Sequence, residues 1–351
     1  MILRLHATRI ACFAVFAIAC SDVTEPAKTV EEFEAQLDDL RAEARIPGMS
    51  AAIVSEGRVA WTAMFGQANV EKGTAVADTT AFHLASLTKP FASTILLQLV
   101  DEGRLSLSQP VTDFGIQLNS SGVVQVKHLL SHTSSGQPGS TYYYDGNRFS
   151  LLDSVFTRTL GQTFAQAVQT RIVQKLGLRH TAPNPLSPDV TVSGKTRAQV
   201  DSNLARGYTY SGGANKLTTY PSNFSTAAGL TASVLDMAAF SIALDSHALL
   251  SQEMLDLAWT PTVTTGGATT PYGLGWFATD YRGQRVIWHY GYWTAISSLI
   301  VKVPSKGLTF IVLANSDALS AAYPLGAGRL ETSPWARAFL DAFVLGSAIV
   351  R

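Results

Sequence analysis

Strand-like segments near both ends of the chain enclose a long helix-rich stretch, and this order of elements strongly constrains the fold. Two β-rich runs at residues 49–54 and 59–65 flank a polar turn, which predicts a hairpin. Later strand patterns lie at residues 275–278, 285–288, 297–303 and 309–313. Because hairpin spacing favours antiparallel pairing, we expect the late strands to complete the sheet that the early hairpin begins.

Helical patterns flank and interrupt these strands. Thr29 and Glu32 form a capping box before an amphipathic segment that ends at residues 46–48, and Ser333 with Pro334 predicts the start of a closing helix. Helical candidates in the middle of the chain are residues 126–130, 151–160, 164–176 and 230–244. The fold class is therefore predicted to be α+β: an antiparallel sheet flanked by helices, with an inserted helical lobe at roughly residues 104–240.

Composition narrows the class of protein. A chain of 351 residues fits one catalytic unit made of two joined lobes. Its 26 basic and 26 acidic residues balance, and no block rich in Lys and Arg provides a surface for nucleic acid. Cys12 and Cys20 are the only cysteines. We therefore expect the domain at residues 30–351 to contain no disulfide, cysteine nucleophile or thiolate metal site.

The first twenty residues are typical of a secretory leader. Arg4 and Arg9 precede an apolar stretch at residues 10–20 that is too short to span a bilayer comfortably. Residues 17–20, Ala-Ile-Ala-Cys, resemble a bacterial lipobox, in which Cys20 becomes the lipidated first residue of the mature protein. A plain leader cleaved nearby is the alternative. We expect residues 21–29 to form a tether, and the protein to be exported to the periplasm or cell envelope of a bacterium.

A serine and a lysine three residues apart stand at the head of the apolar run 91–99. On a helix, Ser86 and Lys89 share one face. A lysine that is desolvated at a helix N-terminus has a lowered pKa and can help to remove the serine proton. Pro90 fits the first helical turn, and Gly103 supplies a stop. The pair is a candidate nucleophile and base, but such pairs recur by chance, so other motifs must support it.

Further segments supply that support. They are the runs 128–136 (His-Leu-Leu-Ser-His-Thr-Ser-Ser-Gly), 138–146, 229–237, 272–276 and 289–291. Together with residues 86–89, and in the same order, they resemble motifs of the serine β-lactamase and penicillin-binding-protein-like family, especially its class C β-lactamase, DD-peptidase and family VIII carboxylesterase branch. The resemblance extends over nearly the whole domain and implies a β-lactamase/transpeptidase-like fold.

The resemblance also implies a covalent acyl-enzyme mechanism that uses no metal and no cofactor. Ser86 takes the role of acylated nucleophile, and Lys89 that of base or proton shuttle. Tyr144 becomes a second base, with a pKa lowered by the neighbouring lysine. His289 replaces the lysine of the family's Lys-Thr-Gly strand and completes the catalytic set.

The same resemblance implies residues that bind the substrate. The backbone amides of the nucleophile and of Tyr292 would form the oxyanion hole, and Gly291 would let the substrate approach the strand closely. Two positions depart from the family pattern. Gly146 replaces an asparagine that holds the acyl side chain, a role for which Asn147 lies one residue out of register. Tyr290 replaces a small hydroxyl residue that helps to bind a carboxylate.

Both departures favour an ester or an unusual amide as the substrate, so the predicted protein is an esterase-like serine hydrolase. One alternative is a DD-peptidase or β-lactamase that acts on cell-wall peptides or penicillins, and another is a non-catalytic member that binds through the same cleft.

His128 and His132 lie four residues apart but have no third ligand nearby, so we interpret them as structural rather than metal-binding. We expect small-molecule or peptide substrates, no nucleic acid, and membrane contact only through the lipid anchor.

Overall fold

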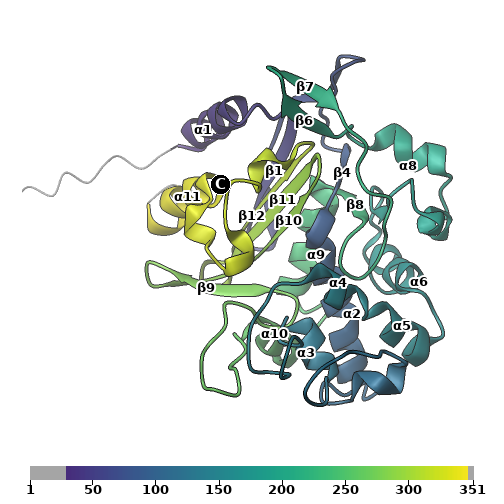
Figure 1. Cartoon of the computed structure of the whole chain (residues 1–351). Helices are drawn as coiled ribbons and strands as arrows, with labels where there is room; N and C mark the ends of the chain where they lie inside the picture. Colours follow the sequence, from purple (N-terminus) through teal and green to yellow (C-terminus); the bar gives the residue numbers. More distant parts are fainter. Residues whose placement is uncertain (1–28, 347–351) are drawn as a thin grey trace, which may run out of the picture.

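The computed structural model describes residues 29–346, and its main feature is a seven-stranded antiparallel sheet (Figure 1). The strand order is β3-β2-β1-β12-β11-β10-β9. The strands are β1 (Gly48–Ser55), β2 (Arg58–Asn69), β3 (Thr74–Ala75), β9 (Phe277–Tyr281), β10 (Gln284–Trp293), β11 (Ile296–Val303) and β12 (Leu308–Ala314). Met49 pairs with Ala314 and Ser55 with Leu308, so the early hairpin and the late strands meet at β1 and β12. The predicted α+β sheet is confirmed.

Terminal helices cover one face of this sheet (Figure 1). They are α1 (Val30–Glu43) and α11 (Pro334–Phe339), which continues as a π-helical segment to Leu345. The capping box predicted at Thr29 is present, and Phe33 from α1 packs edge-on against Phe310 of β12 and Phe343. These contacts join both ends of the described chain to the same sheet face.

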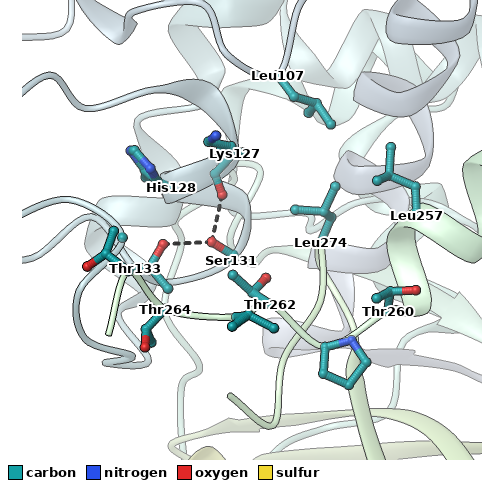
Figure 2. Close-up of a pocket in the computed structure, with 14 residues that line it drawn as sticks. Leu107, Lys127, His128, Ser131, Thr133, Leu257, Thr260, Thr262, Thr264 and Leu274 are labelled. Carbon is teal, nitrogen blue, oxygen red and sulfur yellow. Dashed lines mark hydrogen bonds between the residues drawn. The ribbon is translucent and has the colours of Figure 1, made fainter. Parts of the chain in front are cut away.

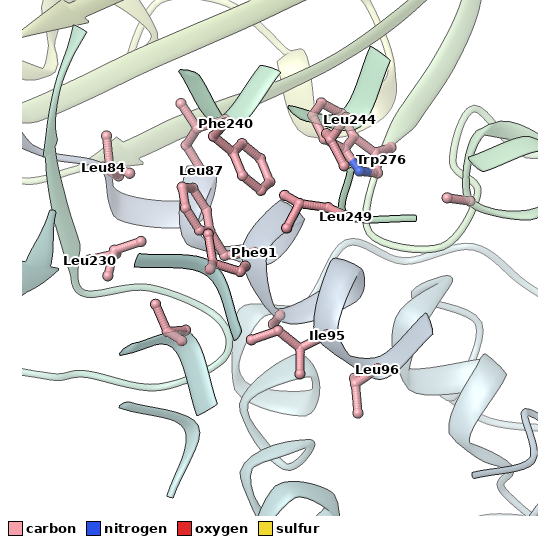
Figure 3. Close-up of a cluster of buried hydrophobic side chains, with 14 of the residues drawn as sticks. Leu84, Leu87, Phe91, Ile95, Leu96, Leu230, Phe240, Leu244, Leu249 and Trp276 are labelled. Atoms are coloured by element: carbon pink, nitrogen blue, oxygen red, sulfur yellow. The ribbon is translucent and has the colours of Figure 1, made fainter. Parts of the chain in front are cut away.

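Helices between β2 and β9 form the lobe on the other face. They are α2 (Lys89–Asp101), α3 (Val126–Leu130), α4 (Gly146–Ser150), α5 (Asp153–Leu160), α6 (Phe164–Val168), α7 (Gln174–Leu176), α8 (Arg197–Asn203), α9 (Val234–Asp245) and α10 (Gln252–Trp259). Helix α2 runs through the centre of the hydrophobic core, where Phe91 stacks on Phe240 at 4.0 Å between ring centroids (Figure 3). This packing holds in place the helix that begins at Lys89.

One helical prediction is wrong at its start. Residues 230–244 were expected to be helical throughout, but Leu230–Ser233 form strand β8, which pairs with β4 (Ala81–His83) and β5 (Ala182–Pro183). Helix α9 begins only at Val234, because the Ser233 side chain caps it by accepting the N–H of Asp236. The four strand residues are all buried, so no alternation of polar and apolar positions distinguished them from a helix.

A second small element was also absent from the sequence prediction. Strands β6 (Tyr208–Ser211) and β7 (Ala214–Leu217) form a hairpin. The predicted leader, Cys20 and most of the tether lie outside the described residues. Within residues 29–346, no helix has the length and apolar character required to cross a membrane.

Candidate active site

Ser86 lies in a single 3₁₀ turn, Ala85–Thr88, immediately before α2. In a 3₁₀ turn residues i and i+3 are eclipsed, and the Lys89 Nζ accordingly lies 2.9 Å from the Ser86 Oγ. Ala85 has φ of 47°, a left-handed conformation that is strained for alanine. The Thr88 hydroxyl stabilises the turn, because it donates to the Ala85 carbonyl at 2.8 Å and accepts the Leu230 N–H at 3.1 Å. Strand β8 therefore supports the turn that carries Ser86 directly.

The Lys89 side chain is fully buried. Besides the Ser86 hydroxyl, its amine contacts the carbonyl oxygen of Ala227 at 3.0 Å. Burial lowers the pKa of Lys89 to about 7, while the charge of Asp145 opposes this shift. An amine that exchanges its proton near neutral pH can accept the proton of a serine hydroxyl.

Tyr144 lies beside this pair. The Lys89 Nζ is 4.9 Å from the centroid of the Tyr144 ring, and the phenol hydroxyl is buried with no hydrogen-bond partner within residues 29–346. Burial and the neighbouring Tyr290 raise the pKa of Tyr144 well above its ordinary value, and the Ser86 hydroxyl opposes that shift only in part. The predicted lowering of the Tyr144 pKa is therefore wrong, because the cost of burying a phenolate exceeds the opposing effect of the Ser86 hydroxyl.

His289 lies behind Tyr144, with ring centroids 6.2 Å apart. Its Nδ1 is 2.8 Å from the Tyr290 carbonyl oxygen, and its Nε2 is 2.9 Å from the Tyr272 hydroxyl. A carbonyl can only accept, so Nδ1 carries the hydrogen and Nε2 accepts from Tyr272. Burial, followed by the charge of Lys89, holds the pKa of His289 well below its ordinary value. Both ring nitrogens of this neutral histidine are thus engaged away from Ser86.

A cavity of about 250 Å³ opens over Ser86. It is lined by Ser86, Lys89, Tyr144, Gly146, Asn147, Ser150, Asn223, Ser225, Ala227, Ala228, Tyr292 and Trp293. The structure thus brings together five of the predicted site residues, whereas His289 and Gly291 do not line this cavity. Of the residues that the sequence did not indicate, Ala227 acts through a backbone carbonyl, for which no sequence signal exists. Asn223 lies in the loop before the recognisable 229–237 motif.

Gly291 stands where two segments of the chain approach each other closely, and its predicted contact with a substrate stays a prediction. A Cβ atom at this position would lie 2.1 Å from the Leu84 carbonyl oxygen and 2.3 Å from the Ser298 Oγ. The absence of a side chain therefore lets β10 approach the chain just before the turn that carries Ser86. The Ser298 hydroxyl donates to the same Leu84 carbonyl at 2.8 Å and reinforces this contact.

The two departures from the family pattern have different surroundings. A Cβ at Gly146 would stand 3.9 Å from the Lys89 Nζ, so a larger side chain there would reach the amine. Asn147 is exposed at the rim of the cavity. Tyr290 does not line the cavity, and its ring packs on Tyr144 at 5.7 Å between centroids.

A second cavity, of about 340 Å³, lies next to the 128–133 segment (Figure 2). His128 lines it, and the Nδ1 of this histidine accepts the N–H of Gln125 at 3.0 Å. The Nδ1 of His132 accepts the N–H of Asp145 at 3.1 Å. No group of three His, Cys, Asp or Glu side chains within residues 29–346 is arranged to hold a metal ion.

Sequence comparisons relate the chain to known proteins. Residues 31–330 match the family model described as Beta-lactamase. The chain is 26% identical over 325 residues to a D-aminopeptidase of Gluconobacter oxydans, a match that covers 80% of this chain and 58% of that protein. It is 28% identical over 203 residues to the esterase EstB of Burkholderia gladioli, covering 44% of this chain and 52% of that protein. The chain thus spans little more than half the length of these curated relatives.

A solved structure shows the same fold. The octameric penicillin-binding protein homologue from Pyrococcus abyssi superposes with a TM-score of 0.77 at 23% identity, over 92% of this chain and 78% of that one. Members of the matched family are serine hydrolases, in agreement with the contact between the half-buried Ser86 and the buried Lys89. The family match extends over most of the chain, and the protein belongs to the Beta-lactamase family.

Proposed function

We propose that the protein is an esterase-like serine hydrolase that acts through a covalent acyl-enzyme on Ser86. The observation that carries this proposal is the 2.9 Å contact between the Ser86 hydroxyl and a buried Lys89 amine whose pKa is about 7. The esterase and D-aminopeptidase relatives support hydrolysis of an ester or amide bond.

The proposed acylation begins when the neutral Lys89 amine accepts the Ser86 proton as the Ser86 oxygen attacks the substrate carbonyl carbon. The bond to the leaving oxygen then breaks. Because the raised pKa keeps Tyr144 protonated, its hydroxyl is suited to donate a proton to that oxygen and to recover one from the Lys89 ammonium. Water then attacks the acyl-enzyme, and the proton transfers run in the reverse order. Tyr144 passes its proton to Lys89 and takes one from the attacking water, and Lys89 returns a proton to the Ser86 oxygen, which regenerates Ser86. The backbone amides of Ser86 and Tyr292 remain our candidates for the oxyanion hole.

The charge of the cavity supports an uncharged substrate. Lys89 is the only described lining residue with a charged side chain, and its amine already contacts Ser86 and Ala227. No free cation in this lining is therefore available to pair with a substrate carboxylate. This favours a neutral ester over a penicillin or a peptide that ends in a free carboxylate.

The test is intact-mass analysis and turnover with three probes: a fluorophosphonate, a short-chain p-nitrophenyl ester and a penicillin. We expect one phosphonyl adduct, ester turnover and little penicillin adduct, and we expect Ser86→Ala to lose both labelling and turnover. A durable penicillin adduct would favour the cell-wall alternative. Absence of any adduct in the folded protein would favour the non-catalytic alternative.

We also propose that the protein is exported and anchored through a lipid on Cys20. The basic and apolar pattern of residues 4–20 and the lipobox-like sequence support this proposal. Mass spectrometry of the mature N-terminus tests it: a diacylglyceryl adduct on Cys20 is expected, and a free amine elsewhere would overturn the lipid anchor.

A further inference from the structure

The segment that carries Tyr144 is held by one residue, His132, at two points. The N–H of Tyr143 donates to the His132 carbonyl oxygen at 2.9 Å. The N–H of Asp145 donates to the His132 Nδ1 at 3.1 Å. Tyr144 lies between these two amides, and the His132 ring packs against its ring at 4.3 Å between centroids.

The backbone of His132 is itself in an unusual conformation. Its φ of 56° lies in the left-handed region, which a non-glycine residue adopts at a cost. The residues on either side stabilise it: Ser131 donates to the Lys127 carbonyl at 2.7 Å, and its hydroxyl lies 2.8 Å from that of Thr133 (Figure 2). Ser131 and Thr133 both line the second cavity. A strained residue that is fixed by its neighbours and contacts a candidate catalytic group suggests a functional constraint.

The protonation state of His132 suits this contact. The ring is buried, and burial, then the charges of Lys89 and His289, hold its pKa well below the ordinary value. A neutral ring with Nδ1 free of hydrogen can accept the Asp145 N–H, whereas a protonated ring could not.

We propose that His132 is a positioning residue that sets the distance between the Tyr144 hydroxyl and the Ser86 and Lys89 pair. This inference rests on the proposed function, since it assigns a task to the hydroxyl that the proposal uses as a proton donor. We call the two hydrogen bonds from the Tyr143 and Asp145 N–H groups to His132 the His132 clamp. The clamp also bears on the next helix, because Asp145 caps α4 by accepting the N–H groups of Asn147 and Arg148. Loss of the His132 contact should therefore release this whole segment.

The primary experiment compares His132→Leu with His132→Asn. Leucine removes the acceptor, whereas the asparagine Oδ1 can occupy the place of Nδ1 and asparagine tolerates a positive φ. We expect His132→Leu to lower kcat for a p-nitrophenyl ester by about 10²-fold with little change in KM, because a misplaced catalytic group costs about that much. His132→Asn should recover most of the loss. Thermal unfolding verifies that each variant is folded.

His128→Leu is the matched control. His128 belongs to the same motif and also accepts a backbone N–H, but its partner is the local Gln125, so kcat should remain close to that of the wild type.

A double-mutant cycle with Tyr144→Phe provides the readout that a merely structural role would not change. In the Tyr144→Phe background, His132→Leu should lower kcat by less than about twofold, because the two residues act as a unit. An equal loss in both backgrounds would overturn the inference.

Hydrogen exchange tests the clamp without any substrate. His132→Leu should accelerate exchange in a peptide that covers residues 143–150, and His128→Leu should not. If the wild type lacks ester turnover but His132→Leu still accelerates this exchange, the proposed function fails and the clamp remains. Unchanged exchange in a folded His132→Leu variant would overturn the clamp itself.

Discussion

Two lysines of this protein, Lys89 and Lys302, are fully buried but have different partners. Lys302 on β11 donates to the Asp245 Oδ2 at 2.9 Å, to the Ser241 Oγ at 2.6 Å and to the Thr309 Oγ1 at 3.0 Å. Lys89 contacts one hydroxyl and one carbonyl oxygen. Burial lowers the pKa of both amines, but at Lys302 the contacting carboxylate of Asp245 opposes the shift.

The difference shows how burial can serve either structure or chemistry. An ammonium in the interior is stable only when a counter-charge or good hydrogen bonds replace its hydration. Asp245 provides that counter-charge for Lys302, and the ion pair joins α9 to the sheet. Lys89 has no carboxylate in contact among the described ion pairs, so its neutral form becomes available near pH 7. The partner, rather than the depth of burial, distinguishes the proposed base from a structural lysine.

The largest expected effect is that of Lys89→Met. Loss of the proposed general base should lower kcat/KM for an ester substrate by about 10²- to 10⁴-fold. The free energy of unfolding should stay the same or rise, since an apolar side chain replaces a buried amine. Steady-state kinetics and urea unfolding measure the two quantities. A folded variant that retains more than a tenth of the activity would remove the distinction between the two lysines.

The next variant, Asp245→Asn, makes Lys302 resemble Lys89. The buried amine loses its counter-charge, so we expect the free energy of unfolding at pH 7 to fall by about 3 kcal/mol. The Asp245 side chain is 32% exposed, which places this loss at the low end for a buried pair. The pKa of Lys302 should fall further, and the loss of stability should shrink as pH rises, because a neutral amine is buried more easily. Equal losses at pH 7 and pH 9 would contradict this account.

The pH dependence of activity follows from the Lys89 pKa of about 7. The proposed base acts as a neutral amine, so kcat/KM should rise about tenfold between pH 6 and pH 8 and then level off.

The free energy of unfolding should also rise with pH. In the unfolded chain the lysine keeps its proton to about pH 10, so the unfolded state binds the extra proton and the free energy of unfolding rises with pH from about 7 to 10. Lys89→Met should lack this rise, and an activity that falls through pH 7 would exclude Lys89 as the base.

The sequence was sufficient to predict the elements that local patterns encode. The antiparallel sheet shared by the early hairpin and the late strands, the caps at Thr29 and Ser333 and the contact between Ser86 and Lys89 all depend on spacing or on end signals. The strand over residues 297–303 was predicted too, but its pattern gave no sign that Lys302 is buried. That burial depends on Asp245, 57 residues away along the chain.

Interactions between distant segments account for what the sequence could not predict. The direction of the Tyr144 pKa depends on burial and on Tyr290, and the hydrogen bond at the His289 Nε2 depends on the Tyr272 hydroxyl. The close packing at Gly291 depends on the approach of the Leu84 carbonyl. None of these contacts has a local pattern, so the motifs indicated five of the residues that line the cavity but not the state in which they are held.

The smallest expected effect is that of Lys302→Met. The Ser241 and Thr309 hydroxyls already lie 3.1 Å apart and can bond to each other, and the partly exposed Asp245 carboxylate remains hydrated. We therefore expect a loss of about 1 kcal/mol in the free energy of unfolding, which corresponds to a fall of a few degrees in Tm. Ester turnover should be unchanged, because Lys302 does not line the cavity over Ser86. A loss of activity as large as that of Lys89→Met, in a folded protein, would mean that the two buried lysines share a task, and the contrast between a paired structural amine and an unpaired catalytic one would fail.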